Sequence, residues 1–230
     1  MSRRRPQQQS FRWKSRGGAR RKPRPENVGL QPHVARPEFD HRLPVHVTMR
    51  AVRGVPSMRT QTVQKAVLTE LSRASEKGFR LLHYSVQDDH LHSIAEADDA
   101  AALSRGMQRL ASRIAMAVNA LVGRRGRFWR ERYHRRDLRK PRQYRNALVY
   151  VLFNIRKHTR GAERARWTRS FDALSSAIWL DEWSDDDIRE KVRAARAGPP
   201  PIAAPKTWMA IKLWKKHGLL DPCESPVSPG

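Results

Sequence analysis

A chain of 230 residues can hold one medium-sized domain with extensions, but it is too short for two large independent cores. Its 47 Lys and Arg residues outnumber its 22 Asp and Glu residues, and the formal net charge of +25 favours nucleic acid as a partner, because neutralised phosphates release counterions. The single cysteine, Cys223, excludes an internal disulfide and a thiolate zinc site, and no run approaches the roughly 18–20 apolar residues of a membrane span.

The first forty residues predict a disordered basic arm. Their Arg, Lys, Gln, Gly and Pro content cannot bury a core, and the first acidic residue is Glu26. The segment also lacks the apolar run of a secretory signal. We expect this arm to contact phosphate, with Arg3, Arg4 and Arg5 among the contacts.

Seven helices and strands are expected in the next segment, residues 41–160. Alternating apolar and polar residues predict strands, and apolar residues three or four apart predict helices. The expected elements are a strand at 44–50, a helix at 59–77 that stops at Gly78, strands at 79–86 and 90–97, a helix at 103–121, a strand at 128–138 and a helix at 141–157. This β-α-β-β-α-β-α order predicts an α+β fold with a ferredoxin-like antiparallel sheet and helices packed on it.

The remaining segment, 161–230, is predicted to be a Trp-rich extension that is broken by proline. Ser184-Asp-Asp-Asp187 is a helix N-terminus signal, Pro199-Pro-Pro201 interrupts the chain, and a short helix is expected at 206–217. We expect the tryptophans of this segment to be packing anchors rather than base-stacking platforms. They are Trp167, Trp179, Trp183, Trp208 and Trp214.

Two histidines share one face of the strand at 90–97. In Asp89-His90-Leu91-His92 both imidazoles project to the same side, while Leu91 points to the other. Two imidazoles on one face can share a divalent metal ion. Taken alone, this spacing more commonly belongs to a structural or solvated pair of histidines.

The last helix of this segment carries a tyrosine and an asparagine one turn apart. Its polar face holds Tyr150, Asn154 and Lys157, well separated from its apolar stripe. The spacing of four residues lets Tyr150 and Asn154 address the same point in space. The simpler interpretation is a half-buried tyrosine with a capping amide.

These residues together resemble a known family. A hydrophobic residue between two histidines on a β-hairpin resembles the HUH motif of single-tyrosine transposases and relaxases. The stretches Arg132-Tyr-His-Arg-Arg-Asp-Leu138 and Arg145-Asn-Ala-Leu-Val-Tyr-Val-Leu-Phe-Asn-Ile-Arg-Lys-His158 are similar to the REP-associated tyrosine transposases. The resemblance covers about 43–158, with a weaker echo at 207–218.

The resemblance implies a catalytic domain at 41–160 that cuts and rejoins single-stranded or hairpin DNA. Tyr150 would be the nucleophile that forms a 5′-phosphotyrosine, and His90, His92 and Asn154 would bind Mg²⁺ or Mn²⁺. The implied protein is bacterial, cytoplasmic and nucleoid-associated, with no membrane contact, and is a monomer or a homodimer.

Further DNA contacts are expected from basic residues of the same stretches, Arg132, Arg135 and Lys157. Lys157 could also favour the phenolate form of Tyr150, because a tyrosine is a poor nucleophile at its ordinary pKa of about 10.

Two positions depart from the family pattern. Asp89 stands where the family commonly has Asn, and Ser93 stands where it has an aliphatic residue. Either change could mark a domesticated copy, so a non-catalytic nucleic-acid-binding protein of the same fold is the alternative. A ribosomal or RNA-chaperone-like protein is a third hypothesis, and it gives no role to Tyr150 or the histidines.

Overall fold

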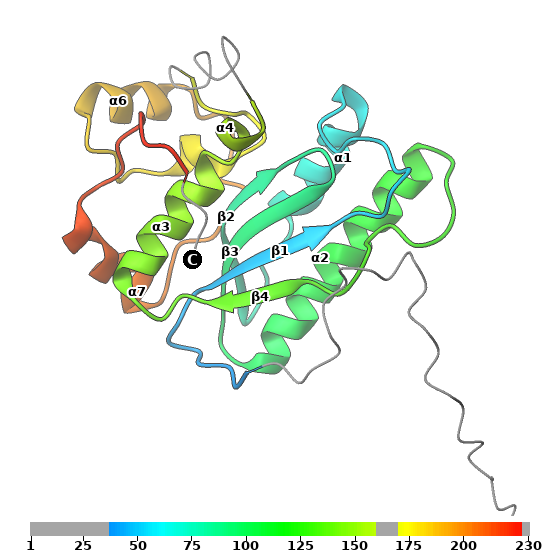
Figure 1. Ribbon diagram of the computed structural model, residues 1–230, viewed down its shortest axis with the longest axis horizontal. Helices are drawn as coiled ribbons and strands as arrows, with labels where there is room; N and C mark the ends of the chain where they lie inside the picture. The colour runs from blue at the N-terminus through cyan, green and yellow to red at the C-terminus, as the bar shows by residue number, and fades with distance from the viewer. Residues whose placement is uncertain (1–36, 160–169, 227–230) are drawn as a thin grey trace, which may run out of the picture. The chain divides into compact units, whose positions relative to one another are not determined.

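A four-stranded antiparallel sheet forms the centre of the fold (Figure 1). The computed structural model describes residues 37–159 and 170–226, so Arg3, Arg4, Arg5 and Trp167 lie outside the described residues. The strands are β1 (Val45–Arg50), β2 (Phe79–Val86), β3 (His90–Ala97) and β4 (His134–Asp137). Their order is β2-β3-β1-β4, and each neighbouring pair is antiparallel. This is the arrangement that two split βαβ units predict.

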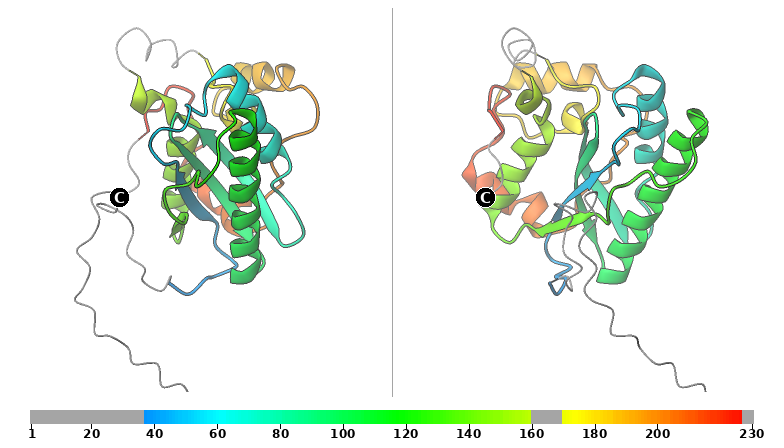
Figure 2. Two further views of the ribbon diagram at one scale, coloured as in Figure 1. Left: turned by 90° about the vertical axis from the view of Figure 1, so that its right-hand side faces the viewer. Right: turned by 45° about the vertical axis from the view of Figure 1, so that its right-hand side comes forward.

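Helices cover both faces of the sheet (Figure 2). The helices α1 (Gln61–Ser72) and α2 (Ala100–Leu121) pack on one face, and α3 (Pro141–Leu152) packs on the other. Each face therefore has its own hydrophobic cluster. Within the part of the chain that the structure describes, no helix is long and apolar enough to cross a membrane.

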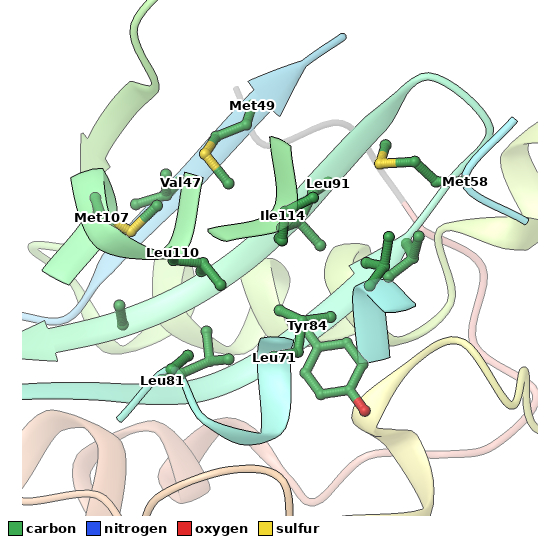
Figure 3. Packing of buried hydrophobic residues seen from close by; sticks show 14 of the residues in the cluster. Val47, Met49, Met58, Leu71, Leu81, Tyr84, Leu91, Met107, Leu110 and Ile114 are labelled. Carbon is green, nitrogen blue, oxygen red and sulfur yellow. The ribbon is translucent and has the colours of Figure 1, made fainter. Parts of the chain in front are cut away.

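The face under α1 and α2 is a closed apolar core. Val47 and Met49 of β1 and Leu91 of β3 point toward residues of α2, among them Met107 (Figure 3). The helix approaches the sheet closely at Gly106, where an added Cβ would lie 2.2 Å from a ring atom of the Phe79 side chain. A side chain at that position would clash with the sheet, which explains a glycine inside a long helix.

The first helix is shorter than expected. It ends at Ser72, although the predicted helix continued to residue 77. Gly78 does not stop a helix; it adopts a φ of 83° in a tight turn in which Glu76 and Phe79 exchange backbone hydrogen bonds. Glycine is needed there because a side chain disfavours positive φ.

The fourth strand is also shorter than the expected 128–138. Residues near Phe128 and Trp129 pair with the chain after β1, through an isolated bridge between Ala51 and Trp129. Regular pairing with β1 resumes only at His134. The backbone thus leaves and rejoins the sheet edge, which local sequence patterns do not reveal.

The expected continuous helix at 141–157 is wrong. α3 ends at Leu152, and a short helix α4 (Ile155–His158) follows a turn at Phe153 and Asn154. The backbone N–H of Phe153 donates to a carbonyl four residues back, whereas that of Asn154 donates to Val151, three residues back. This tightening draws both side chains inward, since Phe153 is 2% exposed and Asn154 is fully buried.

The C-terminal segment packs around α3 and β2. It contains η2 (Ser176–Trp179), α6 (Asp186–Ala194), α7 (Trp208–Ile211) and η3 (Leu213–His217). The signal at 184–187 is confirmed, because the Asp185 side chain accepts the backbone N–H of Ile188 at the start of α6. The expected helix at 206–217 is interrupted at Lys212, whose φ of −134° is not helical.

Buried polar contacts fasten this segment to the core. The carboxylate of Glu96 on β3 accepts hydrogen bonds from Lys206 N and from the N–H and hydroxyl of Thr207. Arg59 forms a two-pronged ion pair with Asp172 at 2.8 and 2.9 Å. These contacts tie the extension to β3, which carries the two histidines, and to the loop before α1.

The prediction that the tryptophans are anchors is confirmed for two of them. Trp183 and Trp214 are almost completely buried, and Trp179 is half-buried. The prediction is wrong for Trp208, which is 57% exposed, with Lys212 Nζ 5.1 Å from the centre of its ring.

Candidate active site

The α3-facing side of the two central strands carries a group of polar side chains. His46 and Thr48 of β1 alternate with Val47, and His90 and His92 of β3 alternate with a leucine. Thr48 lies directly opposite His92 in the antiparallel register. The period of two in a strand thus turns these four side chains away from the apolar core and toward α3.

Tyr150 of α3 lies against this group, as the sequence predicts. The centres of its ring and the His92 ring are 5.0 Å apart, and the rings meet edge to face at 81°. The rings of His90 and His92 are 4.8 Å apart. His46 completes the cluster, stacked on His92 at 5.3 Å and edge-on to Tyr150 at 5.7 Å. Three elements that are distant in the sequence therefore meet at one point.

Each of the two predicted metal-binding histidines has a partner at Nδ1. Asp89 Oδ1 lies 2.7 Å from His90 Nδ1, and Thr48 Oγ1 lies 3.1 Å from His92 Nδ1. Such contacts fix the orientation and tautomer of a metal-binding imidazole and make Nε2 the nitrogen that would bind. Two imidazoles oriented in this way fit a shared divalent ion.

Asp89 is one of the two departures from the family pattern, and it orients a histidine. Partial burial opposes its ionisation, but the hydrogen bond to His90 and the charges of His90 and Arg50 outweigh that effect and lower the pKa of Asp89. Its other oxygen is 3.9 Å from Arg50 Nε. The carboxylate thus bridges the histidine and a surface arginine.

His46 is a site residue that the sequence analysis missed. Burial, together with the positive charges of His134 and Arg136 on the neighbouring strand, lowers its pKa to about 4. The ring is therefore neutral at physiological pH. Within 37–159 and 170–226, no group of three or more His, Cys, Asp or Glu side chains is arranged to hold a metal. His46 contacts the histidine pair without extending it to such a group.

The other predicted site residues differ in their exposure to solvent. Lys157 is exposed, and its Nζ lies 4.6 Å from the centre of the Tyr150 ring, as a cation above an aromatic face. Asn154 is buried in the turn after α3, and its role as a ligand stays a prediction. Arg132 is exposed.

Arg135 has structural partners that account for its position on β4. Its side chain is only 5% exposed, and its Nε lies 2.9 Å from Asp137 Oδ1. The guanidinium also donates to the carbonyl of Pro37 and lies over the ring of Phe39. These contacts anchor the chain before β1, whereas contact of Arg135 with DNA stays a prediction.

Comparison with known proteins finds one matching family for part of the chain. The family model described as "Transposase IS200 like" matches residues 41–151. The matched segment, 111 of the 230 residues, is similar to the IS200-like transposases. The matched segment includes the whole sheet, both histidines and Tyr150, but it ends before Asn154, Lys157 and the C-terminal segment.

The other comparisons are more distant. No curated protein matches this chain. A solved structure described as "Structure of the REP associates tyrosine transposase bound to a REP hairpin" matches with a TM-score of 0.47 and 16% identity, over 64% of this chain and 83% of that chain. The strand order β2-β3-β1-β4 and the antiparallel register of this chain establish its fold by themselves.

Proposed function

We propose that this chain is a metal-dependent single-stranded DNA endonuclease and strand transferase that acts through a 5′-phosphotyrosine. The main support is the contact between the rings of Tyr150 and His92, whose centres are 5.0 Å apart. In addition, the Nδ1 atoms of His90 and His92 each have an oxygen partner. A buried structural tyrosine would not require two oriented imidazoles beside it.

Three side chains are the proposed metal ligands, and two others orient the imidazoles. Nε2 of His90, Nε2 of His92 and the amide oxygen of Asn154 would hold Mg²⁺ or Mn²⁺. A divalent ion there supplies charge that polarises the scissile phosphate. Thr48 and Asp89 keep the imidazoles in the binding orientation.

Tyr150 supplies the nucleophile. Lys157 Nζ lies 4.6 Å from the centre of its ring and places a positive charge beside the attacking group, and the phenol proton passes to solvent. Attack of the phenolate oxygen forms a bond to phosphorus and breaks the bond from phosphorus to the 3′ oxygen, which takes up a proton. A later attack by a 3′-hydroxyl on the phosphotyrosine reseals DNA without ATP, because the phosphodiester energy is kept in the covalent bond.

Single-stranded DNA with a hairpin is the proposed substrate. A net charge of +25 favours a polyanion, and transposases of this family act on DNA. Arg3, Arg4, Arg5 and Arg132 are the proposed phosphate contacts outside the ring cluster, and a monomer or homodimer is the proposed active form.

The test is a covalent adduct with labelled DNA. A single-stranded hairpin from around the gene's own locus is incubated with the full chain and Mg²⁺ or Mn²⁺, and the product is separated by denaturing electrophoresis. We expect a shifted band that needs the metal and that maps to the tryptic peptide containing Tyr150.

Matched variants on one helix sharpen this test. Tyr150→Phe removes one hydroxyl from a half-buried ring and should lose the adduct with little change in stability. Tyr144→Phe alters a buried tyrosine of the same helix and should keep the adduct. An adduct that survives in Tyr150→Phe contradicts the proposal, and DNA binding with no adduct in the wild type leaves a non-catalytic DNA-binding protein.

A further inference from the structure

One histidine outside the proposed metal set contacts both halves of the proposed centre. The ring of His46 is stacked on that of His92, 5.3 Å between centres and 28° between planes. The same ring meets that of Tyr150 at 5.7 Å and 72°. His92 comes from β3 and Tyr150 from α3, so a residue of β1 touches the proposed ligand and the proposed nucleophile at once.

His46 is well placed to hold these two rings at a fixed separation. It is 6% exposed and lies inside the sheet, opposite Ile94 on one side and Arg136 on the other. Its Nε2 atom is buried and has no hydrogen-bond partner among the described residues. Contacts of the ring, rather than a hydrogen bond at Nε2, therefore couple His46 to its neighbours.

We propose that His46 is a positioning residue of this centre, which sets the distance between the Tyr150 hydroxyl and the ion held by His90 and His92. The inference rests on the proposed function. A displacement of reacting groups by about 1 Å can cost roughly a hundredfold in rate. Loss of the His46 ring therefore slows the chemical step while the ligands themselves remain.

The test compares two buried histidines of the same sheet. His46→Ala removes the spacer, His46→Phe keeps a planar ring of similar size, and His83→Ala is the matched control. His83 is as buried as His46, its pKa is also lowered to about 4, and it contacts Ser176 rather than Tyr150. If His46→Ala does not fold, His46→Leu fills the volume without a planar ring and replaces it.

The first readout is single-turnover adduct formation at saturating DNA and Mn²⁺. We expect His46→Ala to be roughly 10- to 100-fold slower than wild type, with DNA and Mn²⁺ affinities within about threefold, and His46→Phe to regain most of the rate. His83→Ala should lose stability but keep its rate. Equal rates in His46→Ala and wild type overturn the proposal, and so does an equal slowing in His83→Ala.

The second readout does not depend on activity. The chain has four tyrosines, so a ¹³C-tyrosine NMR spectrum is simple, and the Tyr150→Phe spectrum assigns the Tyr150 signal. We expect that signal to shift and broaden in His46→Ala but not in His83→Ala. A wild-type chain that forms no adduct refutes the proposed function, whereas an unchanged Tyr150 signal in His46→Ala refutes the positioning role.

Discussion

The two faces of the central sheet use the same strands for opposite purposes. Along β1, Val47 and Met49 enter the core under α1 and α2, while His46 and Thr48 turn to α3. One face is filled with apolar side chains, and the other has buried imidazoles and a hydroxyl at its centre. Because the alternation has a period of two, a register slip by one residue would exchange core and site.

Because one face is apolar and the other carries the proposed site, substitutions on the two faces should affect different properties. Substitutions on the apolar face should change the free energy of unfolding and leave the chemistry of the folded molecule alone. Substitutions on the α3-facing side, near the ring cluster, should change metal binding or rate more than stability. Variants on each face, measured for both stability and rate, test whether the two properties respond separately.

The largest contrast is expected between adjacent residues of β3. His90→Ala and His92→Ala should abolish metal-dependent adduct formation, because each removes a proposed metal ligand, while DNA binding and thermal stability stay close to wild type. Leu91→Ala should cost about 2–5 kcal/mol of stability, because Leu91 is 1% exposed in the core. Mn²⁺ titration, gel shift and thermal melting measure these effects. Normal cleavage in both histidine variants would remove the metal-site hypothesis.

A smaller effect is expected from the partner of His92. Thr48→Val keeps the shape of the side chain but removes the oxygen that lies 3.1 Å from His92 Nδ1. Loss of such a contact typically weakens metal binding by about 10- to 100-fold. The Mn²⁺ concentration for half-maximal adduct formation should rise accordingly, with the rate recovered at saturating metal. An unchanged metal dependence would mean that Thr48 does not orient the ring.

The sequence predicts the sheet and the centre of the site well. The strands at 79–86 and 90–97 are found with the predicted bounds, because short alternating runs with a polar turn leave few alternatives. Tyr150 lies beside the histidines because the strand and helix periods determine which faces meet. To predict that His46 lies beside His92, one must also know that β1 pairs with β3.

Other features depend on tertiary contacts that no local pattern encodes. The helix break before Asn154 is invisible in the sequence because Ile155 continues the apolar stripe across it. Arg135 resembles a DNA contact in a basic stretch, yet Asp137 and Phe39 enclose it. Trp208 is exposed although Trp214, six residues later, is buried, and the helix expected to carry both is interrupted at Lys212 between them.

A pH effect on stability should appear at His83, which lies away from the rings of the proposed centre. Burial lowers its pKa to about 4, below the 6.5 of an exposed histidine. The folded state therefore binds fewer protons than the unfolded state between these values, and stability falls as pH drops from 6.5 to about 4. The full effect is about 3 kcal/mol. Urea unfolding at pH 7 and pH 4.5 should show a smaller difference in His83→Leu than in wild type, and an equal difference contradicts the assignment.

The smallest effect is expected at Ser93, the second departure from the family pattern. Its side chain lies on the apolar face, in register with Val47 and Tyr84, and is 1% exposed. The hydroxyl is buried and has no hydrogen-bond partner among the described residues. An unsatisfied buried hydroxyl costs free energy, so Ser93→Ala should stabilise the protein by about 1 kcal/mol, or roughly 2–4 °C in Tm.

Because Ser93 faces away from the rings of His92 and Tyr150, adduct formation by Ser93→Ala should match the wild type. Calorimetry measures the Tm of Ser93→Ala, and single-turnover kinetics measure its rate of adduct formation. A lower Tm would show that the hydroxyl is satisfied in solution. A higher Tm with a slower rate would instead couple the two faces through β3, and would contradict the separation of packing from chemistry on which the other predictions rest.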